Sequence, residues 1–387
     1  MFEMEQQGDL SLLTTNIFSA ILDAGSSMPF ARETTQIPYS LGNNEIVAPE
    51  IFPAKGGVRV LIPHDPELAH YNAAVIKSIK NPSESLILLR EVPTAGVKAG
   101  TPDKGNLLIY RSTPEKVERV AQLDLSDPAV SNWEDARAFV SHDFNLEDQR
   151  DDCEGVLIGL TAIRANDNKP VAATVRGKVL NGEFLLDQES LAVFKDDQGK
   201  NVTPISLNRS LFRREGERHS LEVIEYDMDE NGHNKLKVRQ IIQFPKKSWC
   251  EWQIGTQAQF LPEGILPIHG VNKFNLGIDP KTGEEVDGYA YSMGLAQLDE
   301  ELNVIKISDT PLFNRESFKN ILPMGIELDT NKDVIYCCGY SVEEDTIKFV
   351  VNIGDLMTVE VSKNMSELRS ILAKSSPNAL EKVPKAA

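Results

Sequence analysis

Two carboxylates and one guanidinium lie close together in the segment Trp133–Arg137, which reads Trp-Glu-Asp-Ala-Arg. A carboxyl group can donate a proton only where burial or a neighbouring negative charge keeps it protonated near neutral pH, and Glu134 offers such a charge to Asp135. Arg137 follows two positions later, so on a strand it faces the same side as Asp135 and opposes that effect unless it is paired elsewhere. By itself the segment fits a surface Asp–Arg pair on a strand edge better than it fits an acid.

Two residues that could bind an anion follow apolar runs of the sequence. Arg90 follows Leu-Ile-Leu-Leu, and His269 follows Ile-Leu-Pro-Ile. Fixed positive donors of this kind bind phosphate when several of them cluster. Each residue also has a structural explanation, because an arginine can end a strand with its charge in water and a lone histidine is commonly a hydrogen-bonded structural residue.

The elements that would hold these residues are strands. Short runs rich in Val, Ile, Leu, Phe and Tyr are separated by turn signals such as the Asn-Gly pairs at 181–182 and 231–232. No long helical period interrupts them, which argues against a βαβ or doubly wound fold. We expect strands at Val58–Ile62, Leu86–Arg90, Leu107–Arg111, Val156–Thr161, Val171–Val175, Leu221–Tyr226, Ile265–Gly270, Val334–Gly339 and Ile347–Asn352.

In five segments, a few polar residues precede a strand, a turn and a strongly apolar strand. We call these polar residues, with the start of the strand that follows them, the lead-in of the repeat. The segments recur at intervals of about sixty residues, and they begin near Tyr71, Trp133, Asn201, Trp252 and Phe318. This repeat predicts an all-β chain folded as a five-bladed β-propeller, with the lead-in of each repeat near the central axis. A ligand would bind at that axis.

Helices are expected only at the two ends of the chain. The apolar spacing over Leu10–Asp23 predicts a helix within an N-terminal helical arm of residues 1–44. The propeller domain then covers residues 45–362, and residues 363–387 form a C-terminal helix (Ser366–Lys374) and tail. The N-terminal helix would also suit self-association into a homo-oligomer.

The formal net charge of −18 opposes binding to nucleic acids and to anionic membrane surfaces. No run approaches the ~20 apolar residues of a membrane span, and the first residues lack the pattern of a signal peptide. We therefore expect a cytoplasmic protein that binds no nucleic acid and no membrane. No spacing suggests a metal site, and free thiols are expected at Cys153, Cys250, Cys337 and Cys338.

Taken in order, the lead-in segments resemble glycoside hydrolase family 130, the β-mannoside phosphorylases and β-mannosidases. Tyr71–Lys77 and the following Leu86–Arg90 are similar to the family's Phe-Asn-Pro-Ala-Ala segment and its strand ending Leu-Leu-Tyr-Arg. Trp133–Arg137 is similar to its Glu-Asp-Pro-Arg, with Ala136 in place of proline.

Three later segments continue the resemblance. Gln253–Val271 is similar to the family's Lys-Ile-Gly and to its Gly-Trp-Leu-x-x-Tyr-His-Gly-Val. Tyr291–Asp299 is similar to its Tyr-x-x-Gly-Ala-x-Leu-Leu-Asp, and Tyr336–Asp345 to its Tyr-Tyr-Gly-Ala-Ala-Asp. The order and approximate spacing hold over most of the chain.

The resemblance implies a glycosidase that cleaves β-mannosidic or related bonds in an oligosaccharide or small sugar. It implies inversion at the anomeric carbon with Asp135 as the general acid, and no cofactor. It also implies substrate contacts from Asn72, Arg90, Glu134, Arg137, His269, Tyr291 and Asp345. Aromatic residues beside the motifs would either stack on sugar rings or belong to the core: Tyr71, Trp133, Trp252, Tyr291 and Tyr340.

At two positions the sequence departs from the family's motifs, and both positions bear on whether water or phosphate attacks the sugar. Gln253 replaces the lysine of Lys-Ile-Gly, and Pro170 stands where an arginine is expected. Losing two cations in an acidic chain favours hydrolysis over phosphorolysis, which uses inorganic phosphate as co-substrate. The candidate bases for hydrolysis are Glu225, Glu251 and Glu263.

Two alternatives remain open, a β-mannoside phosphorylase and a non-catalytic glycan-binding propeller. A further departure is a stretch longer than in the family, from Asn272 to Asp287, which follows His269. It is expected to be a loop that caps the site and influences which sugar fits.

Overall fold

The computed structural model describes residues 45–46, 57–63, 65, 67–77, 84–93, 105–141, 153–180, 182–228, 234–256, 259–278, 284–318, 332–354 and 357–376. These residues are mostly strand, so the prediction of an all-β chain is confirmed. Every strand expected from the sequence is present, with one of them beginning a residue late, at Ile335. The predicted N-terminal arm of residues 1–44, with its helix at Leu10–Asp23, lies outside the described residues.

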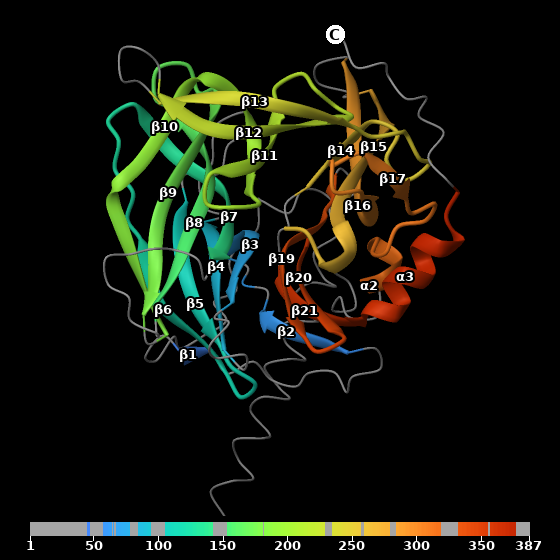
Figure 1. Ribbon diagram of the computed structural model, residues 1–387, viewed down its shortest axis with the longest axis horizontal. Helices are drawn as coiled ribbons and strands as arrows, with labels where there is room; N and C mark the ends of the chain where they lie inside the picture. The colour runs from blue at the N-terminus through green and yellow to red at the C-terminus, as the bar shows by residue number, and fades with distance from the viewer. Residues whose placement is uncertain are drawn as a thin grey trace, which may run out of the picture.

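Strand pairing among the described residues gives four sheets (Figure 1). The first sheet has the order β1-β6-β5-β4-β3. Its strands are β1 (Glu45–Ile46), β3 (Leu68–Lys77), β4 (Ser85–Pro93), β5 (Asn106–Ser112) and β6 (Val117–Leu123).

The second sheet has seven strands, in the order β13-β12-β11-β10-β9-β8-β7. They are β7 (Val130–Ser141), β8 (Cys153–Arg164), β9 (Pro170–Leu180), β10 (Glu183–Pro204), β11 (Arg209–Arg214), β12 (Ser220–Met228) and β13 (Asn234–Gln243). The 22-residue β10 pairs with β9 up to Gln198 and with β11 from Gly199 onward. Two groups of antiparallel strands are therefore joined by one shared strand.

The third sheet contains β14 (Gln253–Gly255), β15 (Ile265–Ile278), β16 (Glu285–Leu298) and β17 (Val304–Ile307), with β18 (Lys332–Asp333) parallel to β16. A single 3₁₀ turn at Pro262–Gly264 leads into β15. The predicted loop from Asn272 to Asp287 is wrong, because β15 and β16 continue as a paired hairpin as far as Ile278 and Glu285. Gly288 stands opposite Phe274 and leaves room for its ring, since a Cβ there would lie 2.3 Å from a ring carbon.

The fourth sheet joins the two ends of the described chain. It contains β19 (Ile335–Glu343), β20 (Thr346–Ile353), β21 (Met357–Asn364) and β2 (Val58–Ile62). Because β2 lies near the start of the described chain and pairs with β21, the last strand, segments from the two ends of the fold hold each other in place. The fifth repeat was expected to begin near Phe318, and this is wrong, since Phe318 ends the short helix α2 (Arg315–Phe318) and the strand starts at Ile335.

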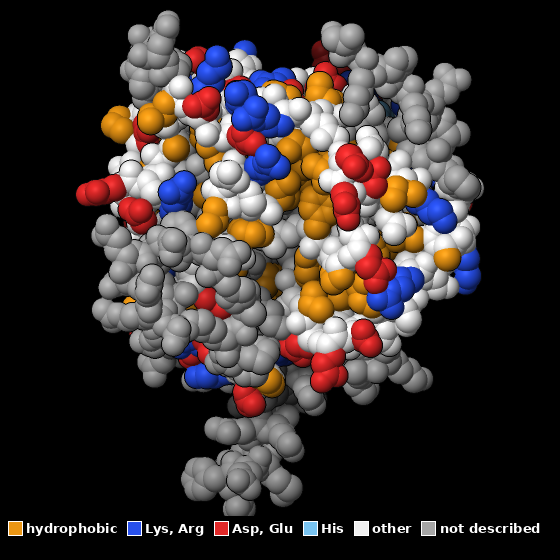
Figure 2. All heavy atoms as spheres, viewed as in Figure 1, with side chains coloured by type: hydrophobic (Ala, Val, Ile, Leu, Met, Phe, Trp, Pro, Cys, Tyr) orange, Lys and Arg blue, Asp and Glu red, His pale blue; other side chains and the backbone are white. Residues whose placement is uncertain are grey.

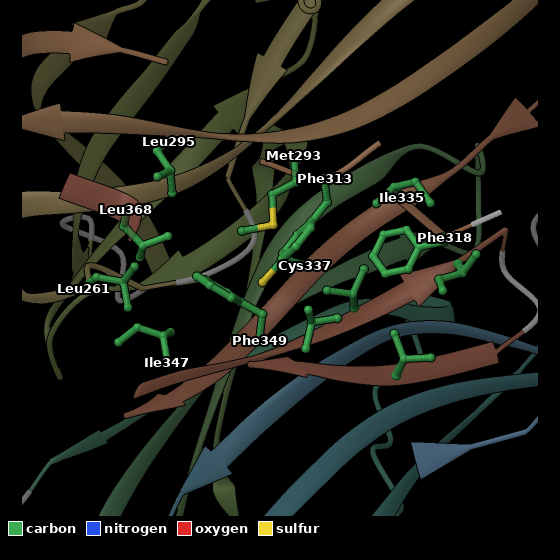
Figure 3. Close-up of a cluster of buried hydrophobic side chains, with 14 of the residues drawn as sticks. Leu261, Met293, Leu295, Phe313, Phe318, Ile335, Cys337, Ile347, Phe349 and Leu368 are labelled. Atoms are coloured by element: carbon green, nitrogen blue, oxygen red, sulfur yellow. The ribbon is translucent and has the colours of Figure 1, made fainter. Parts of the chain in front are cut away.

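A large apolar cluster packs between the third and fourth sheets (Figure 3). Met293 and Leu295 from β16 meet Cys337 from β19 and Phe349 from β20. The C-terminal helix expected at Ser366–Lys374 is α3 (Met365–Lys374), and it closes this cluster. Its buried residues are Met365, Leu368 and Leu372, the spacing of one helical face.

The surface carries charges of both signs. On the face drawn in Figure 2, Lys and Arg side chains gather over β12 and β13, where Lys235, Lys237 and Arg239 are exposed. Among the helices that the structure describes, none is long and apolar enough to cross a membrane.

Three strands carry the same local irregularity, a single left-handed residue at a break in strand register. The residues are Asn72 on β3, Asp135 on β7 and Asn201 on β10, with φ of 53°, 52° and 61°. Asn and Asp tolerate this conformation better than other side chains that carry a Cβ. A bulge of this kind interrupts the alternation of a strand and redirects the side chains around it. All three lie in predicted lead-in segments.

The side chain of Asn352 ties the fourth sheet to the first. Its Oδ1 accepts a hydrogen bond from the backbone N–H of Ala73 at 2.9 Å. Its Nδ2 donates to Thr358 Oγ1 at 2.9 Å and to the carbonyl oxygen of His70 at 3.4 Å. Asn352 is fully buried. Because Ala73 follows Asn72, this amide fixes the backbone of the first bulge.

We expect Asn352→Ala to lower the free energy of unfolding by about 2–3 kcal/mol, because it leaves a buried N–H and a buried hydroxyl without their partner. Chemical denaturation followed by circular dichroism measures the change. The control is Asn234→Ala, an exposed residue at the start of β13, for which we expect a change within about 0.5 kcal/mol. Equal effects of the two substitutions would contradict this role.

Candidate active site

Asp135 lies at the bulge of β7 and is 8% exposed. The Nδ2 of Asn72 donates a hydrogen bond to its Oδ1. Two left-handed residues from different sheets therefore meet side chain to side chain. The reading of Trp133–Arg137 as a surface Asp–Arg pair is wrong, because Asp135 and Arg137 are both buried and no ion pair joins them in the described structure.

Glu134 is the second carboxylate beside Asp135, and both of its oxygens are engaged. Arg90 Nη2 lies 3.2 Å from Oε1, and Lys200 Nζ lies 3.2 Å from Oε2. Asn132 Nδ2 also donates to Oε1 at 3.3 Å. Burial lowers the pKa of the Lys200 ammonium, but the charges of Asp135 and Glu134 outweigh this effect and hold that pKa above its usual value. Lys200 is therefore a firmly charged cation next to both carboxylates.

Arg137 is the most buried charged side chain of the group, with 1% of its surface exposed. Its Nη1 donates to the carbonyl oxygen of Ala136 at 2.5 Å. Its Nε and Nη2 have no hydrogen-bond partner among the described residues. Burying a guanidinium without a counter-charge is strongly unfavourable, so this geometry calls for an anion beside Arg137.

His269 on β15 is 3% exposed, and neither of its ring nitrogens has a partner in the part of the chain that the structure describes. Burial, together with the positive charges of Arg213 and Arg137, holds the pKa of His269 well below its usual value. The imidazole is therefore neutral at physiological pH. One ring nitrogen can then donate a hydrogen bond while the other accepts one.

Arg213 on β11 is a site residue that the sequence reasoning missed. Its charge acts on His269, Lys200 and Tyr336, so it faces the same space as they do. Its neighbour Arg214 points elsewhere and pairs with Glu222 at 2.8 Å and with Asp197 at 3.3 Å. The available signal was two consecutive arginines ending an apolar strand, where alternation sends them to opposite faces.

Two tyrosines complete the group. The ring centroid of Tyr336 lies 5.1 Å from that of His269 and 4.9 Å from that of Tyr291, and Tyr291 lies 6.4 Å from His269. Burial and the neighbouring Tyr291 raise the pKa of Tyr336, to which the charge of Asp135 also contributes. The hydroxyl of Tyr336 is therefore protonated at neutral pH. The two tyrosines supply polar groups beside a surface of aromatic rings.

The balance of charge in this group is positive. Four cations, Arg90, Arg137, Lys200 and Arg213, accompany two carboxylates, Glu134 and Asp135. This is opposite to the net charge of −18 of the whole chain. An excess of fixed cations in a buried group favours the binding of an anion there.

Several predicted residues do not join this group. Asp345 is exposed in the turn between β19 and β20, where its carbonyl oxygen accepts from the backbone N–H of Met365 next to α3. The substrate-binding role predicted for it is therefore not supported. Gln253 is buried on β14. No cluster of three or more potential metal ligands occurs within the described ranges.

The three candidate bases for hydrolysis are also placed elsewhere. Glu225 is paired with Arg209 at 2.9 Å and with Arg239. Glu263 is paired with Arg369 of α3 at 2.5 Å. Glu251 has an exposed side chain in the segment before β14. None of them contacts a residue of the charged group.

The aromatic residues beside the motifs have different positions. Trp133 donates its indole N–H to the carbonyl oxygen of Leu125 at 3.2 Å and packs on the core. Tyr340 donates its hydroxyl to the carbonyl oxygen of Phe260 and also packs on the core. Tyr71 lies under the guanidinium of Arg90, 5.1 Å from its ring centroid. Trp252 lies instead against Tyr289 of β16.

No protein-family model matches this sequence, and no curated protein matches it either. Solved structures do match. A β-1,2-mannobiose phosphorylase from Listeria innocua in complex with β-1,2-mannobiose has 16% sequence identity and a TM-score of 0.50, and the match covers 87% of this chain and 98% of that one.

Two further structures match equally well in shape. One represents the GH130 family of mannoside phosphorylases, described as containing glycoside hydrolases that target β-1,2 mannosidic linkages in Candida mannan. It has 14% identity and a TM-score of 0.50, with 82% of this chain and 96% of that chain covered. The other, a glycosyl hydrolase from Bacteroides ovatus, has 14% identity and a TM-score of 0.50, with 91% and 98% covered. The likeness to glycoside hydrolase family 130 predicted from the motifs is therefore confirmed for the fold.

Proposed function

We propose that this chain is an inverting enzyme that cleaves β-mannosidic bonds, with Asp135 as the general acid and inorganic phosphate as the nucleophile. The observation that carries the proposal is the buried guanidinium of Arg137, which forms no ion pair with any described residue although it lies two positions from the buried Asp135. The fold shared with mannoside phosphorylases supplies the class of substrate.

The framework of the proposal is a five-bladed propeller. The strand β10 divides the seven-stranded sheet into two blades, which with the other three sheets makes five. Strands β3, β7 and β19, from three different sheets, contact one another as inner strands around an axis would (Figure 1). The pairing of β2 with β21 would close such a ring, because it joins strands from the two ends of the chain.

Asp135 is suited to the role of acid by its surroundings. It is buried, and Asn72 holds one of its oxygens in a fixed position. The other oxygen is then free to point at the leaving oxygen of the substrate. Asn72 is in turn held by the bond from Asn352 to the adjacent Ala73.

Phosphate is suited to the space between Arg137, Arg213 and His269. Guanidinium groups bind phosphate oxygens through paired, charge-assisted hydrogen bonds. The neutral His269 ring adds a donor without adding charge. Arg213 thus supplies a cation of the kind that is missing at Gln253 and Pro170. For this reason we favour phosphorolysis, whereas the sequence alone favoured hydrolysis.

Water is the weaker candidate for the nucleophile. Inverting hydrolysis needs a second carboxylate that takes a proton from water, about 6.5–9.5 Å from the acid. Glu134 is near, but its two oxygens are occupied by Arg90 and Lys200. The bases suggested from the sequence, Glu225 and Glu263, are paired with arginines outside the group.

The reaction then proceeds in one displacement. An oxygen of hydrogen phosphate forms a bond to the anomeric carbon while the bond between that carbon and the glycosidic oxygen breaks. The proton of Asp135 goes to the departing oxygen, and the proton of the phosphate is released to restore the acid. The products are α-mannose 1-phosphate and the sugar that carried the bond.

We expect Asp135→Asn to reduce turnover of β-1,2-mannobiose by about 10²–10⁴-fold, because an amide cannot donate the proton that the leaving oxygen needs. Product formation is followed by chromatography, and melting curves check that the variant is folded. The control is Asp124→Asn, an exposed carboxylate that accepts from Gln122, for which we expect full activity. Full activity of Asp135→Asn would rule out its role as acid. Binding of mannobiose without turnover by the unmodified protein would instead favour a glycan-binding propeller.

We expect Arg213→Gln to raise the KM for phosphate at least about tenfold, because one charge-assisted hydrogen bond is worth ~1.5–3 kcal/mol. The rate of α-mannose 1-phosphate formation is measured against phosphate concentration. The matched control is the adjacent Arg214→Gln, which removes the ion pairs to Glu222 and Asp197 and leaves the KM unchanged. Release of free mannose at an undiminished rate without phosphate would refute phosphorolysis and restore hydrolysis.

A further inference from the structure

We propose that Trp252, Tyr289 and Arg218 form a second sugar-binding platform, which takes further units of a longer mannan chain beyond the bond that is cleaved. The inference rests on the proposed function, since it extends the same site. These three residues are called the rim platform below. None of them belongs to the group around Asp135.

The rim platform continues one face of the β15–β16 hairpin. Tyr291, which contacts Tyr336 in the site, pairs with Val271, and Tyr289 pairs with Lys273 two positions further along. Because no register break separates these pairs, Tyr289 and Tyr291 point to the same side of β16. They are spaced by about 6.6 Å. An aromatic surface thus leads from the site towards the hairpin tip.

Trp252 and Arg218 come from neighbouring segments and widen this surface. The ring centroids of Trp252 and Tyr289 lie 5.2 Å apart, with an angle of 55° between the ring planes. The guanidinium carbon of Arg218 lies 4.9 Å from the centroid of the Trp252 ring. Trp252 and Tyr289 are partly exposed and Arg218 is exposed, so the platform faces solvent. Figure 1 shows β14, β15 and β16 side by side, with Trp252 immediately before β14.

Polar groups surround the rings. Lys273 and Asp287 are joined by an ion pair at 2.6 Å, and the positive charge of Arg218 lies close enough to act on Lys273. His219, next to Arg218, contacts the carbonyl oxygen of Glu251 at 3.0 Å. Rings bordered by fixed donors and acceptors are typical of small-molecule sites in which polar groups set orientation.

A pyranose unit matches this chemistry. One face of the sugar ring presents C–H groups that carry a small positive charge, and the face of an aromatic ring is negative. The hydroxyl groups at the ring edge can bond to Arg218 and to the Lys273–Asp287 pair. A peptide or lipid would lack this combination of an apolar face with a hydroxylated edge. Continuity with the site through Tyr291 then makes the occupant another part of the same substrate.

The platform predicts a preference for chain length. Binding energy from sugar units remote from the cleaved bond raises the rate on long substrates and leaves short ones unaffected. We expect Trp252→Ala to lower kcat/KM for β-1,2-mannotetraose about threefold to tenfold. We expect the same variant to cleave β-1,2-mannobiose at the rate of the unmodified protein.

The matched control is Phe274→Ala on the same hairpin. Phe274 is 38% exposed and packs over Gly288, on the opposite face of β15 from Lys273. We expect it to leave both substrates unaffected. An equal loss on mannobiose and mannotetraose in Trp252→Ala, or no loss on either, would overturn the proposal.

A binding measurement separates this inference from the proposed function. Mannotetraose is titrated calorimetrically into Asp135→Asn and into Asp135→Asn combined with Trp252→Ala. Weaker binding in the double variant supports the rim platform even if no mannoside is ever cleaved. Equal affinity of the two proteins overturns the platform, whatever the turnover experiments show.

Discussion

A guanidinium group buried without a counter-charge is among the most unfavourable arrangements that a folded chain can contain. Within the described part of the chain Arg137 is in that position, and Arg213 adds a second positive charge that acts on the same histidine. Such an arrangement persists where the surrounding structure is strong enough to impose it and where a ligand relieves it. The neutral His269 and the fully paired Glu134 both follow from this excess of positive charge. The proposed binding of phosphate by an acidic protein depends on the same excess.

The surrounding structure imposes the arrangement through its bulges. Asn72 and Asp135 occupy left-handed conformations on strands of different sheets and bond to each other. Asn352, which lies on the fourth sheet, holds the bulge at Asn72 in place by accepting a hydrogen bond from the backbone N–H of Ala73. Because β2 and β21 pair, the sheet that holds Asn352 is anchored at both ends of the fold. The stability of the sheets and the position of Asp135 therefore depend on the same contacts.

The sequence predicted the strands and the motif positions well, because alternation and turn residues are local properties. It also placed Asp135, Asn72, Arg90 and His269 in one region through the order of the motifs. It missed Arg213 and Lys200, which reach the site from β11 and β10 only because the sheets fold around it. It also assigned a loop to Asn272–Asp287, where glycine opposite Phe274 and continued cross-strand pairs extend a hairpin. Contacts between sheets are set by three-dimensional packing, and no local pattern records them.

The most direct test of the account is the titration of His269, followed by NMR on the histidine-labelled protein with and without phosphate. Burial and the charges of Arg213 and Arg137 lower the pKa of His269. A phosphate bound between these residues offsets the two positive charges, so the account predicts that saturating phosphate raises the pKa of His269. Superimposable titration curves with and without phosphate would contradict the central claim that these cations hold the anion.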